Sequence, residues 1–469
     1  MKKFLTYSLA ILFAGTMASC SKSDPPLPDN TINFTADKQG IDAATSEVEV
    51  KLSLSRSADV AVPLTVTLTS TGVVYGTQYT TDPAAVNNTI TLTIPVGSTT
   101  ASFKVKRVAG TVLSGSEKIA FTLTSAGSPI VLGSTSKAEL SFAAIISEGS
   151  SLTLNGITAA NEAGASAGNS VYVDFSGNAQ VAVARDSWDL GFYSGTDFKV
   201  IINSTNGASA LVTTKTDLAT VTAADFNADD LKVGQGGGNF TIIDDGREAN
   251  ILNKTAIASV SATDADNKVY IINRSGGSNT VLPTADLYKI RILRKGTTGY
   301  TLQYAKVAET TFKTLDITKD EASNFQFASL VTGTTKTVEP AKVNWDLTWS
   351  WSMYYTFSGA NPIPYGFSDL VFVNNLAGVT AAEVLTSTVS YSAYAEANIA
   401  STTFLNKRDV IGSNWRATTG AAVGVKTDRF YAVKDAAGNV YKLKFVSFHP
   451  SDGGVRGKPV IEYKLVKKN

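Results

Sequence analysis

The sequence predicts an all-β protein, and two regularities along the chain support this prediction. Between Ile32 and about Ala144, apolar residues alternate with polar ones in short runs, as in residues 47–54 (EVEVKLSL). A period of two is typical of strands with one buried and one solvated face. Turn-forming Gly, Pro, Asn and Ser separate the runs, and no amphipathic helical pattern interrupts them. The region is therefore predicted to be an antiparallel sandwich.

The first residues predict export and lipid attachment. A short basic start, Lys2 and Lys3, precedes the apolar run 4–15. This run is shorter than the roughly 20 residues that a membrane-spanning helix needs, which is typical of a signal peptide. Small residues then precede Cys20 in an arrangement that resembles the bacterial lipobox. We therefore expect residues 1–20 to be a lipoprotein signal peptide that is cut before Cys20, with a lipid on the thiol of that cysteine.

The composition excludes several classes of protein. The chain has 41 Lys and Arg against 40 Asp and Glu, so it lacks the basic surplus that nucleic-acid binding needs. Cys20 is the only cysteine, so no intramolecular disulfide can form and no thiol remains for catalysis after acylation. Residues 21–30 are predicted to be a flexible tether. The remaining length suits roughly two to four domains.

Residues 31–147 resemble a Calx-beta module, which is a sandwich of the immunoglobulin-like class. The resemblance lies in segments 75–79 (YGTQY), 94–97 (IPVG), 103–105 (FKV) and 117–123 (EKIAFTL). Calx-beta domains often bind Ca²⁺, which takes about six to eight oxygen ligands from clustered carboxylates. Here Gln78 stands where the family has an acidic residue, and no acidic pair follows Val105. The resemblance therefore implies a spacer domain, and calcium binding is not expected.

A long internal repeat follows the predicted sandwich. Four pairs of segments match in the same order: 187–192 (SWDLGF) with 344–349 (NWDLTW), 218–225 (LATVTAAD) with 376–383 (LAGVTAAE), 288–292 (YKIRI) with 441–445 (YKLKF), and Tyr304 with Tyr463. The spacing within each pair is nearly constant. We therefore predict two copies of one domain, residues 148–308 and residues 309–469.

Each copy is expected to contain one short helix among its strands. Thr222 is followed by Asp225, and Thr380 by Glu383. This spacing is typical of a capping box, in which a threonine and an acidic residue satisfy backbone donors at the start of a helix.

The C-terminal repeat segment predicts a β-hairpin. Residues 435–439 (DAAGN) have the composition of a tight turn. In the following segment 441–445 (YKLKF), the apolar side chains are expected to face a core, and Lys442 and Lys444 to face water.

The repeated Trp-Asp-Leu segment is expected to have a structural role. Large aromatic side chains in an apolar strand usually lie in the core. Trp188 and Trp345 are therefore predicted to be core residues. Asp189 and Asp346 are predicted to accept hydrogen bonds from nearby backbone N–H groups.

The order of these features is similar to that of the HmuY family. The shared features are a strand at Trp-Asp-Leu, a short capped helix, and a C-terminal hairpin running from 430–433 (FYAV) to 441–445. The resemblance covers about residues 149–466, and the second copy is the closer match from Phe312 onward. The predicted fold is thus an immunoglobulin-like, Calx-beta-like sandwich followed by two tandem HmuY-like, mainly antiparallel β domains, each with a short helix.

HmuY-like proteins are surface lipoproteins of Gram-negative bacteria, and the founding members capture haem and pass it to an outer-membrane receptor. Those members ligate haem through two histidines, and some relatives look methionine-based. After export, this chain has one histidine, His449, and one methionine, Met353. The resemblance implies these two as candidate haem ligands, with Trp351, Tyr354 and Tyr355 as aromatic residues on which a flat macrocycle could stack. The first copy has neither ligand, so only tyrosine could serve there.

Two functions follow as hypotheses. The first is a lipid-anchored protein of the Gram-negative outer membrane, exposed at the surface or facing the periplasm, that binds haem or another small ligand for uptake, with haem, a haem protein or an outer-membrane receptor as partners. The second is an adhesive or structural surface lipoprotein that has lost haem binding. An enzyme is not expected, because no nucleophile, base and metal occur together in a recognisable pattern.

Overall fold

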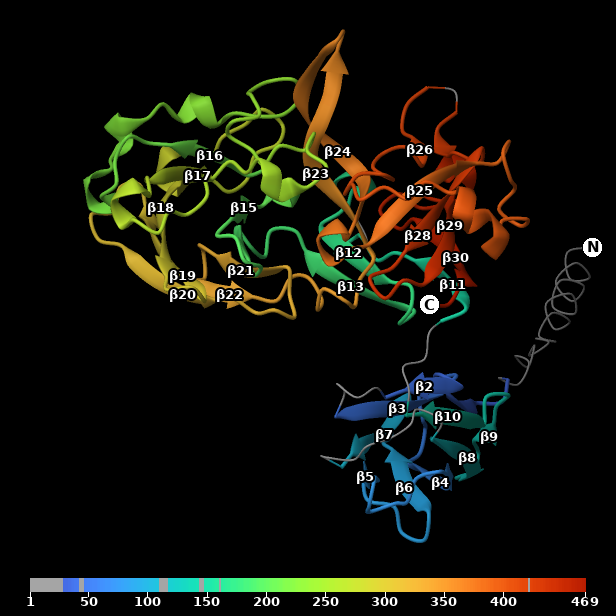
Figure 1. Ribbon diagram of the computed structural model, residues 1–469. Helices are drawn as coiled ribbons and strands as arrows, with labels where there is room; N and C mark the ends of the chain where they lie inside the picture. The colour runs from blue at the N-terminus through green and yellow to red at the C-terminus, as the bar shows by residue number, and fades with distance from the viewer. Residues whose placement is uncertain (1–27, 42–45, 109–116, 143–146, 160–161, 421) are drawn as a thin grey trace, which may run out of the picture. The chain divides into compact units, whose positions relative to one another are not determined.

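The computed structural model describes residues 28–41, 46–108, 117–142, 147–159, 162–420 and 422–469. The chain divides into two compact units, an N-terminal unit, Met1–Ile145, and a C-terminal unit, Ile146–Asn469. The expected signal peptide 1–20, its Cys20, and most of the expected tether lie outside the described residues. Antiparallel strands dominate both units (Figure 1), which confirms the all-β prediction.

The N-terminal unit is built from two five-stranded sheets. The first has the order β5 (Tyr79–Asp82), β7 (Thr100–Arg107), β3 (Glu47–Leu54), β1 (Thr31–Phe34), β9 (Val131–Leu132). The second has the order β2 (Lys38–Gly40), β10 (Lys137–Ser141), β8 (Lys118–Ala126), β4 (Val62–Thr71), β6 (Thr89–Ile94).

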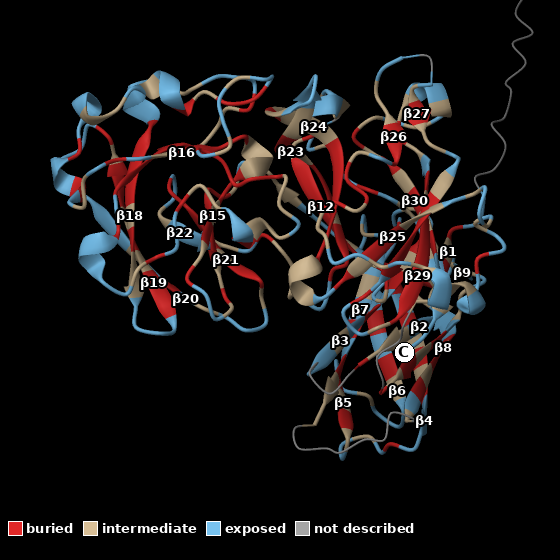
Figure 2. Ribbon diagram, turned by 45° about the horizontal axis from the view of Figure 1, so that its top comes forward, coloured by how far each residue is buried: buried red, intermediate tan, exposed pale blue. Residues whose placement is uncertain are grey.

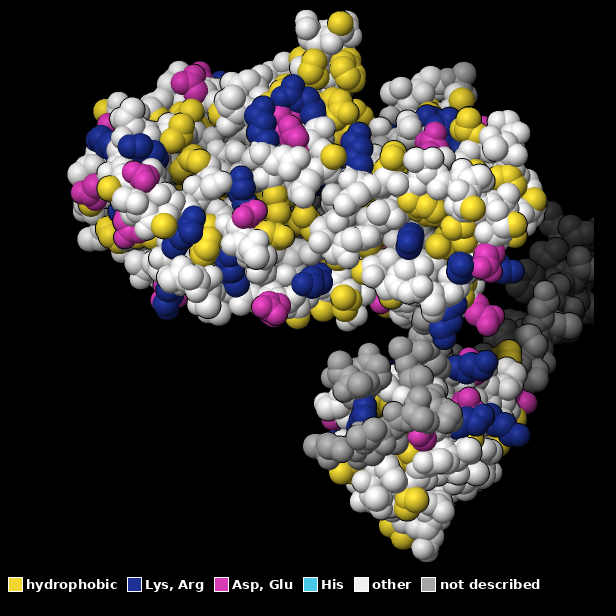
Figure 3. Space-filling model, in the orientation of Figure 1, with side chains coloured by type: hydrophobic (Ala, Val, Ile, Leu, Met, Phe, Trp, Pro, Cys, Tyr) yellow, Lys and Arg dark blue, Asp and Glu magenta, His cyan; other side chains and the backbone are white. Residues whose placement is uncertain are grey.

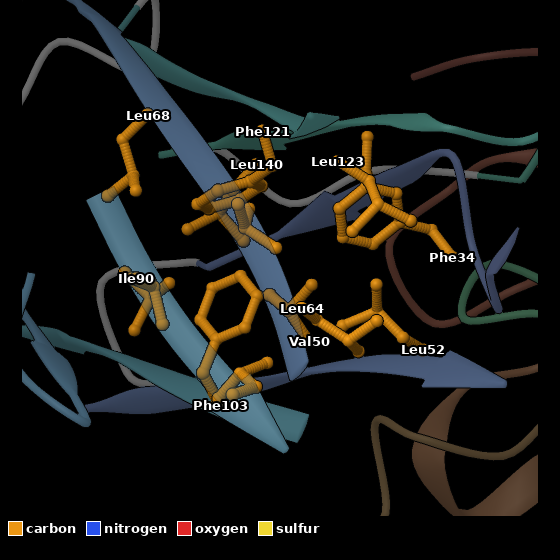
Figure 4. Close-up of a cluster of buried hydrophobic side chains, with 14 of the residues drawn as sticks. Phe34, Val50, Leu52, Leu64, Leu68, Ile90, Phe103, Phe121, Leu123 and Leu140 are labelled. Atoms are coloured by element: carbon orange, nitrogen blue, oxygen red, sulfur yellow. The ribbon is translucent and has the colours of Figure 1, made fainter. Parts of the chain in front are cut away.

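The core of the N-terminal unit lies between these two sheets, as Figure 4 shows. In β3, Val50, Leu52 and Leu54 are buried, while the intervening side chains are exposed or half-buried. Phe103 of β7 meets Phe121 of β8 edge to face, with ring centroids 5.1 Å apart, and so links the sheets. The alternation in the sequence therefore predicted the buried face correctly.

The C-terminal unit contains four larger sheets and one small one. Two of them have five strands: β11 (Gly149–Thr153), β30 (Val460–Lys467), β29 (Val440–Ser447), β28 (Arg429–Lys434), β25 (Thr380–Leu385); and β16 (Ser209–Val212), β17 (Tyr270–Asn273), β18 (Tyr288–Lys295), β19 (Gly299–Lys306), β20 (Lys313–Thr318). Two have four: β13 (Ala179–Ala184), β12 (Asn169–Asp174), β23 (Leu347–Ser358), β24 (Asn361–Val373); and β15 (Val200–Ile202), β14 (Leu190–Tyr193), β21 (Phe325–Ser329), β22 (Thr334–Lys336). The small sheet pairs β26 (Arg416–Ala417) with β27 (Gly424–Val425).

The helices of the described residues are all short 3₁₀ helices: Gly164–Ser166, Ser204–Asn206, Leu218–Thr220, Ala223–Asp225, Ala228–Leu231, Ile251–Asn253, Asp264–Asp266, Thr284–Asp286, Asn375–Ala377, Glu396–Ser401 and Pro450–Asp452. None of these described helices has the length and hydrophobicity that crossing a membrane requires.

The two predicted copies are not separate domains. Strands β11 and β12, which fall in the first predicted copy, pair with β30 and β23 of the second, respectively. Strands β20 and β21, which fall in the second, pair with β19 and β14 of the first, respectively. The boundary expected near residue 308 therefore runs through paired strands. Strand pairing over more than 300 residues, as between β11 and β30, leaves no local signal in the sequence.

One of the two predicted helix caps is correct. Thr222 and Asp225 form a capping box on the 3₁₀ helix Ala223–Asp225, where the Thr222 backbone N–H donates to Asp225 Oδ2 at 2.7 Å. The prediction for Thr380 and Glu383 is wrong, because both residues lie in strand β25, paired with β28. There Glu383 accepts a hydrogen bond from Arg429 at 3.0 Å. The pairing with β28 outweighs the weak local preference for a helix.

Replacing Thr222 by alanine is expected to destabilise the C-terminal unit by about 1 kcal/mol, the usual cost of losing an N-cap. Thr380→Ala is the matched control, since its threonine caps no helix and should cost at most about 0.5 kcal/mol. Urea denaturation of both variants measures the two values. Equal losses would contradict the capping role of Thr222.

The prediction for Lys442 is also wrong, because its side chain is buried. Its Nζ donates to the backbone carbonyls of Tyr391 at 2.7 Å and Tyr394 at 2.8 Å. Lys289, its counterpart in the repeated YK segment, is buried too and donates to Val221 O at 2.8 Å. Burial lowers the pKa of both lysines. A loop covers this face of each strand, and its free carbonyls satisfy the ammonium group.

Buried residues line the strands at the centre of the C-terminal unit, among them β12 and β29 (Figure 2). Trp415 stacks on Phe445, with ring centroids 4.1 Å apart, and its Nε1 donates to Asp369 O at 3.0 Å. The predicted turn 435–439 is confirmed, since Asp435 N donates to Asn439 O between β28 and β29.

Candidate functional site

The Trp-Asp-Leu segments have the predicted structural role. Trp188 and Trp345 are 5% and 8% exposed. Asp189 Oδ2 accepts from the backbone N–H of Leu330 at 2.7 Å, and Asp346 Oδ2 accepts from that of Phe175 at 2.7 Å. Each aspartate therefore accepts a hydrogen bond from the backbone N–H just after the end of a neighbouring strand, which is β21 for Asp189 and β12 for Asp346.

Two asparagines that sequence reasoning missed complete these segments. Asn203 Nδ2 donates to Trp188 O at 2.7 Å, and Asn374 Nδ2 donates to Trp345 O at 3.0 Å. Each asparagine precedes a 3₁₀ helix that ends at a glycine with positive φ, 69° at Gly207 and 90° at Gly378. In the sequence, an asparagine followed four residues later by a glycine could have indicated this arrangement in both copies.

The β23–β24 hairpin presents an exposed apolar surface on the C-terminal unit. Its two strands are the longest in the described residues, and the end of the hairpin projects from the sheets in Figure 1. Phe357 is 61% exposed, and Tyr355 packs against it with ring centroids 5.7 Å apart. Tyr365 and Phe367, both half-buried, form a second pair at 5.4 Å. Figure 3 shows hydrophobic side chains in yellow along the projecting hairpin.

Met353, a predicted haem ligand, belongs to β23, and its side chain lies in the core. Its side chain is 3% exposed and packs with Val233, Ile242 and Ile243. The thioether therefore fills apolar space, a common role of methionine. A ligand could reach the sulfur only after this cluster opened.

His449, the other predicted ligand, lies in the turn after β29. It precedes the 3₁₀ helix Pro450–Asp452, and its Nδ1 accepts from the backbone N–H of Ser451 at 3.2 Å. The same nitrogen lies 2.7 Å from Ser451 Oγ. The imidazole thus caps a helix, and its described partners differ from those of Met353.

The three predicted aromatic residues differ in how accessible they are. Tyr354 is 8% exposed, and its hydroxyl donates to Asp409. Tyr355 is half-buried beside the exposed Phe357. Trp351 is also half-buried, and the Arg185 guanidinium lies 5.3 Å from the centroid of its ring. Of the predicted ligand residues with an iron-binding side chain, Tyr355 is the one on the open part of the hairpin.

Basic side chains from distant segments lie beside the hairpin. Arg247 Nε donates to Asp245 Oδ1 at 2.8 Å, and Lys254 Nζ lies 2.9 Å from Asp245 Oδ2. Burial opposes the ionisation of Asp245, but the hydrogen bonds from Arg247 and Lys254 outweigh it and lower its pKa. Two cations thus share the carboxylate of Asp245, and Glu248 also acts electrostatically on Arg247. The segment contacts the hairpin, because a Cβ on Gly246 would lie 3.0 Å from the Tyr354 ring.

A second pair of cations extends this basic group. Lys407 Nζ lies 3.1 Å from Asp409 Oδ1, and the adjacent Arg408 guanidinium lies 4.1 Å from the ring centroid of Phe372 in β24. Sequence spacing could not reveal the group, since its members come from loops more than 150 residues apart. In the described part of the chain, no group of three or more His, Cys, Asp or Glu side chains could hold a metal ion.

An open groove of about 470 Å³ lies elsewhere on the C-terminal unit. Its lining is mostly hydroxyls, amides and charged groups, with Tyr193 as its one aromatic residue. Lys319, which lines it, donates to the carbonyls of Gly195 at 2.6 Å and Asp197 at 3.1 Å. The groove is polar, unlike the hairpin surface.

Comparison with known proteins identifies one family. The model of the family described as HmuY protein matches residues 166–463, which is more than half of the chain. No curated protein matches the sequence.

Several solved structures are weakly similar. The apo form of the Calx CBD1 domain is 14% identical, with 25% of this chain and 97% of that chain covered and a TM-score of 0.22. A two-domain protein of unknown function from Bacteroides fragilis is 9% identical, with coverages of 48% and 82% and a TM-score of 0.19. A putative carbohydrate binding protein from Bacteroides ovatus is 11% identical, with coverages of 73% and 97% and a TM-score of 0.18.

Proposed function

The chain belongs to the HmuY family, and we propose that it is a surface lipoprotein that captures haem, or a similar flat ligand, on the β23–β24 hairpin. The family is one of binding proteins, so no enzymatic step is involved. The observation that supports this proposal best is an exposed aromatic hairpin with basic side chains beside it.

The proposal includes export and anchoring. Residues 1–20 act as a lipoprotein signal peptide, and a lipid on Cys20 holds the protein in the outer membrane of a Gram-negative bacterium. The N-terminal unit, a Calx-beta-like spacer, carries the C-terminal unit away from the lipid. Captured haem then passes to an outer-membrane receptor.

The chemistry of the hairpin suits a tetrapyrrole. The faces of the macrocycle are apolar and flat, so they gain from burial against Tyr355 and Phe357. Its two propionates are anionic, and Arg247, Lys254 and Lys407 supply the positive charge that they need. An exposed aromatic side chain costs solubility, so a binding role explains why Phe357 is 61% exposed.

Tyr355 is the axial ligand that we propose for the haem iron. Phenolate oxygen is an established haem ligand, and Tyr355 lies half-buried on the open part of the hairpin. Met353 and His449 are the second proposal for the axial pair. That pair needs the core around Met353 to open and the His449 cap to break.

Haem titration of the soluble chain, residues 21–469, tests the proposal by absorbance. We expect a saturable one-to-one Soret shift. Tyr355→Phe keeps the ring but removes the oxygen, so it should weaken haem binding by about tenfold or more, a loss of about 1.4 kcal/mol. Met353→Leu, which conserves volume, and His449→Gln should leave the affinity unchanged.

The variants separate the two proposals for the axial ligand. Weakening by Met353→Leu and His449→Gln, but not by Tyr355→Phe, would support the paired site and reject Tyr355. A spectrum identical to that of free haem for every chain would reject haem capture altogether.

The alternative proposal is an adhesive surface lipoprotein that has lost haem binding. The open polar groove supports this function, because hydroxyls, amides and one tyrosine suit contact with a glycan. If haem does not bind, the next measurement is whether oligosaccharides slow hydrogen exchange of the residues that line the groove.

A further inference from the structure

A small cavity lies inside the C-terminal unit, apart from the exposed face of the hairpin. Its volume is about 110 Å³. An engineered protein cavity of about 150 Å³ binds benzene, so this cavity suits a ligand of fewer than roughly six non-hydrogen atoms. One part of its lining is apolar: Ile201, Ile251, Phe325, Phe372 and Leu376. The other part is polar or charged, with Asp244, Glu339, Trp345, Thr348 and Arg408.

Trp345 and Thr348, which line the cavity, each carry a buried polar atom without a hydrogen-bond partner. Trp345 Nε1 and Thr348 Oγ1 are buried and make no hydrogen bond to any described residue. Trp345 itself is 8% exposed. A buried donor without a partner costs about 1–3 kcal/mol, so both atoms favour a bound group that accepts hydrogen bonds.

Arg408 adds a cation to the same lining. Its guanidinium stacks on Phe372 and forms no ion pair or hydrogen bond with another side chain of the described residues. Burial lowers its pKa, although Asp409 and Asp244 act electrostatically in the opposite direction. A stacked guanidinium with free N–H groups is well placed to bind a planar oxyanion through two hydrogen bonds.

The two acids of the cavity do not neutralise this cation fully. Asp244 accepts from the backbone N–H groups of Ile202 at 2.8 Å and Ala256 at 2.9 Å, and Glu339 accepts from that of Phe325 at 2.9 Å. Burial raises the pKa of Asp244 to about 7 and that of Glu339 to about 8. Near neutral pH, Glu339 is therefore mostly uncharged and Asp244 is partly so. A cation would find little negative charge here.

We propose that this cavity binds a small monocarboxylate, of the size of acetate or propionate. The carboxylate pairs with Arg408 and accepts hydrogen bonds from Trp345 Nε1 and the Thr348 hydroxyl. The methyl or ethyl group lies against the apolar lining, where Phe325 and Leu376 contribute. Asn324 and Leu376 line both this cavity and the open groove. The site does not depend on haem capture at the hairpin.

Indole ¹⁵N NMR of the full soluble chain tests this site with acetate as the probe. Only five tryptophans contribute signals, and Trp345→Phe identifies the one that matters. We expect acetate and propionate to shift the Trp345 indole signal in a saturable way. Acetamide, the neutral analogue of acetate, should not shift it.

Variants of the lining complete the test. Arg408→Gln should weaken acetate binding by at least about tenfold, and Thr348→Val, which conserves shape, by a smaller factor. Lys295→Gln removes an exposed cation paired with Asp316 and is the matched control, so it should leave acetate binding unchanged. No shift with acetate, an equal shift with acetamide, or unchanged binding in folded Arg408→Gln and Thr348→Val would each overturn the proposal.

Discussion

Replacing Asp189 by alanine is expected to destabilise the C-terminal unit by about 3–4 kcal/mol. The Asp189 carboxylate is buried and pairs with Arg274 at 2.8 Å, while its other oxygen accepts from the backbone N–H of Leu330. Burial raises the pKa of Asp189, although Arg274 opposes the change. Removing one partner of a buried pair costs about 3–5 kcal/mol, because the other charge stays behind unpaired. Urea or guanidinium unfolding measures the loss.

The neighbouring acid provides the control for this prediction. Asp186 is exposed, and only its backbone carbonyl contacts Arg274. Asp186→Ala should therefore change the free energy of unfolding by no more than about 0.5 kcal/mol. Asp189→Asn keeps an acceptor for Leu330 but loses the charge, so an intermediate loss is expected. Equal, small effects of Asp189→Ala and Asp186→Ala would show that the Trp-Asp segment does not support the fold.

The stability of the C-terminal unit is expected to fall as pH rises from about 5 to about 8. Burial raises the folded-state pKa of Glu339 to about 8, well above the ordinary glutamate value of 4.5. Between these values the unfolded chain has lost the proton and the folded chain keeps it, so unfolding releases a proton and becomes easier as pH rises. Full deprotonation of this one group corresponds to a loss on the order of 4 kcal/mol. Asp244 adds to the same slope below about pH 7.

Glu339→Gln removes this titration while retaining an oxygen for Phe325 N–H. The variant should be more stable than the wild type at pH 8.5 by a few kcal/mol, on the order of that same 4 kcal/mol, and its stability should vary less between pH 5 and 8. Glu396→Gln is the matched control, since Glu396 is an exposed partner of Lys467. A Glu339→Gln curve parallel to the wild type would mean that Glu339 is already ionised in the folded protein.

The sequence predicted the features that depend on local pattern. Period-two alternation identified the strands of the N-terminal unit, and the repeated Trp-Asp segment identified two buried tryptophans and their aspartates. The capping pattern predicted a helix correctly at Thr222 but not at Thr380, because Thr380 lies in a strand that pairs with β28. Alternation in YKLKF placed Lys442 in water because a pattern along one strand cannot show the loop that covers it.

Local sequence patterns could not predict the features that depend on contacts between distant segments. Strand β11 pairs with β30 across the whole C-terminal unit, so the predicted copies exchange their outer strands. The basic side chains beside the hairpin come from two separate loops, and neither loop has a recognisable motif. Met353 and His449 were predicted as haem ligands from their residue type alone. Whether haem can reach a side chain depends on its burial, and Met353 is 3% exposed.

Hydrogen exchange of the soluble chain with and without haem tests capture at the hairpin most directly. Bound haem should slow exchange in the open part of β23 and β24, around Tyr355, and in the adjoining segment 245–254. The N-terminal unit should not change. Protection confined to the turn at His449, or no protection anywhere at saturating haem, would contradict capture by the aromatic hairpin.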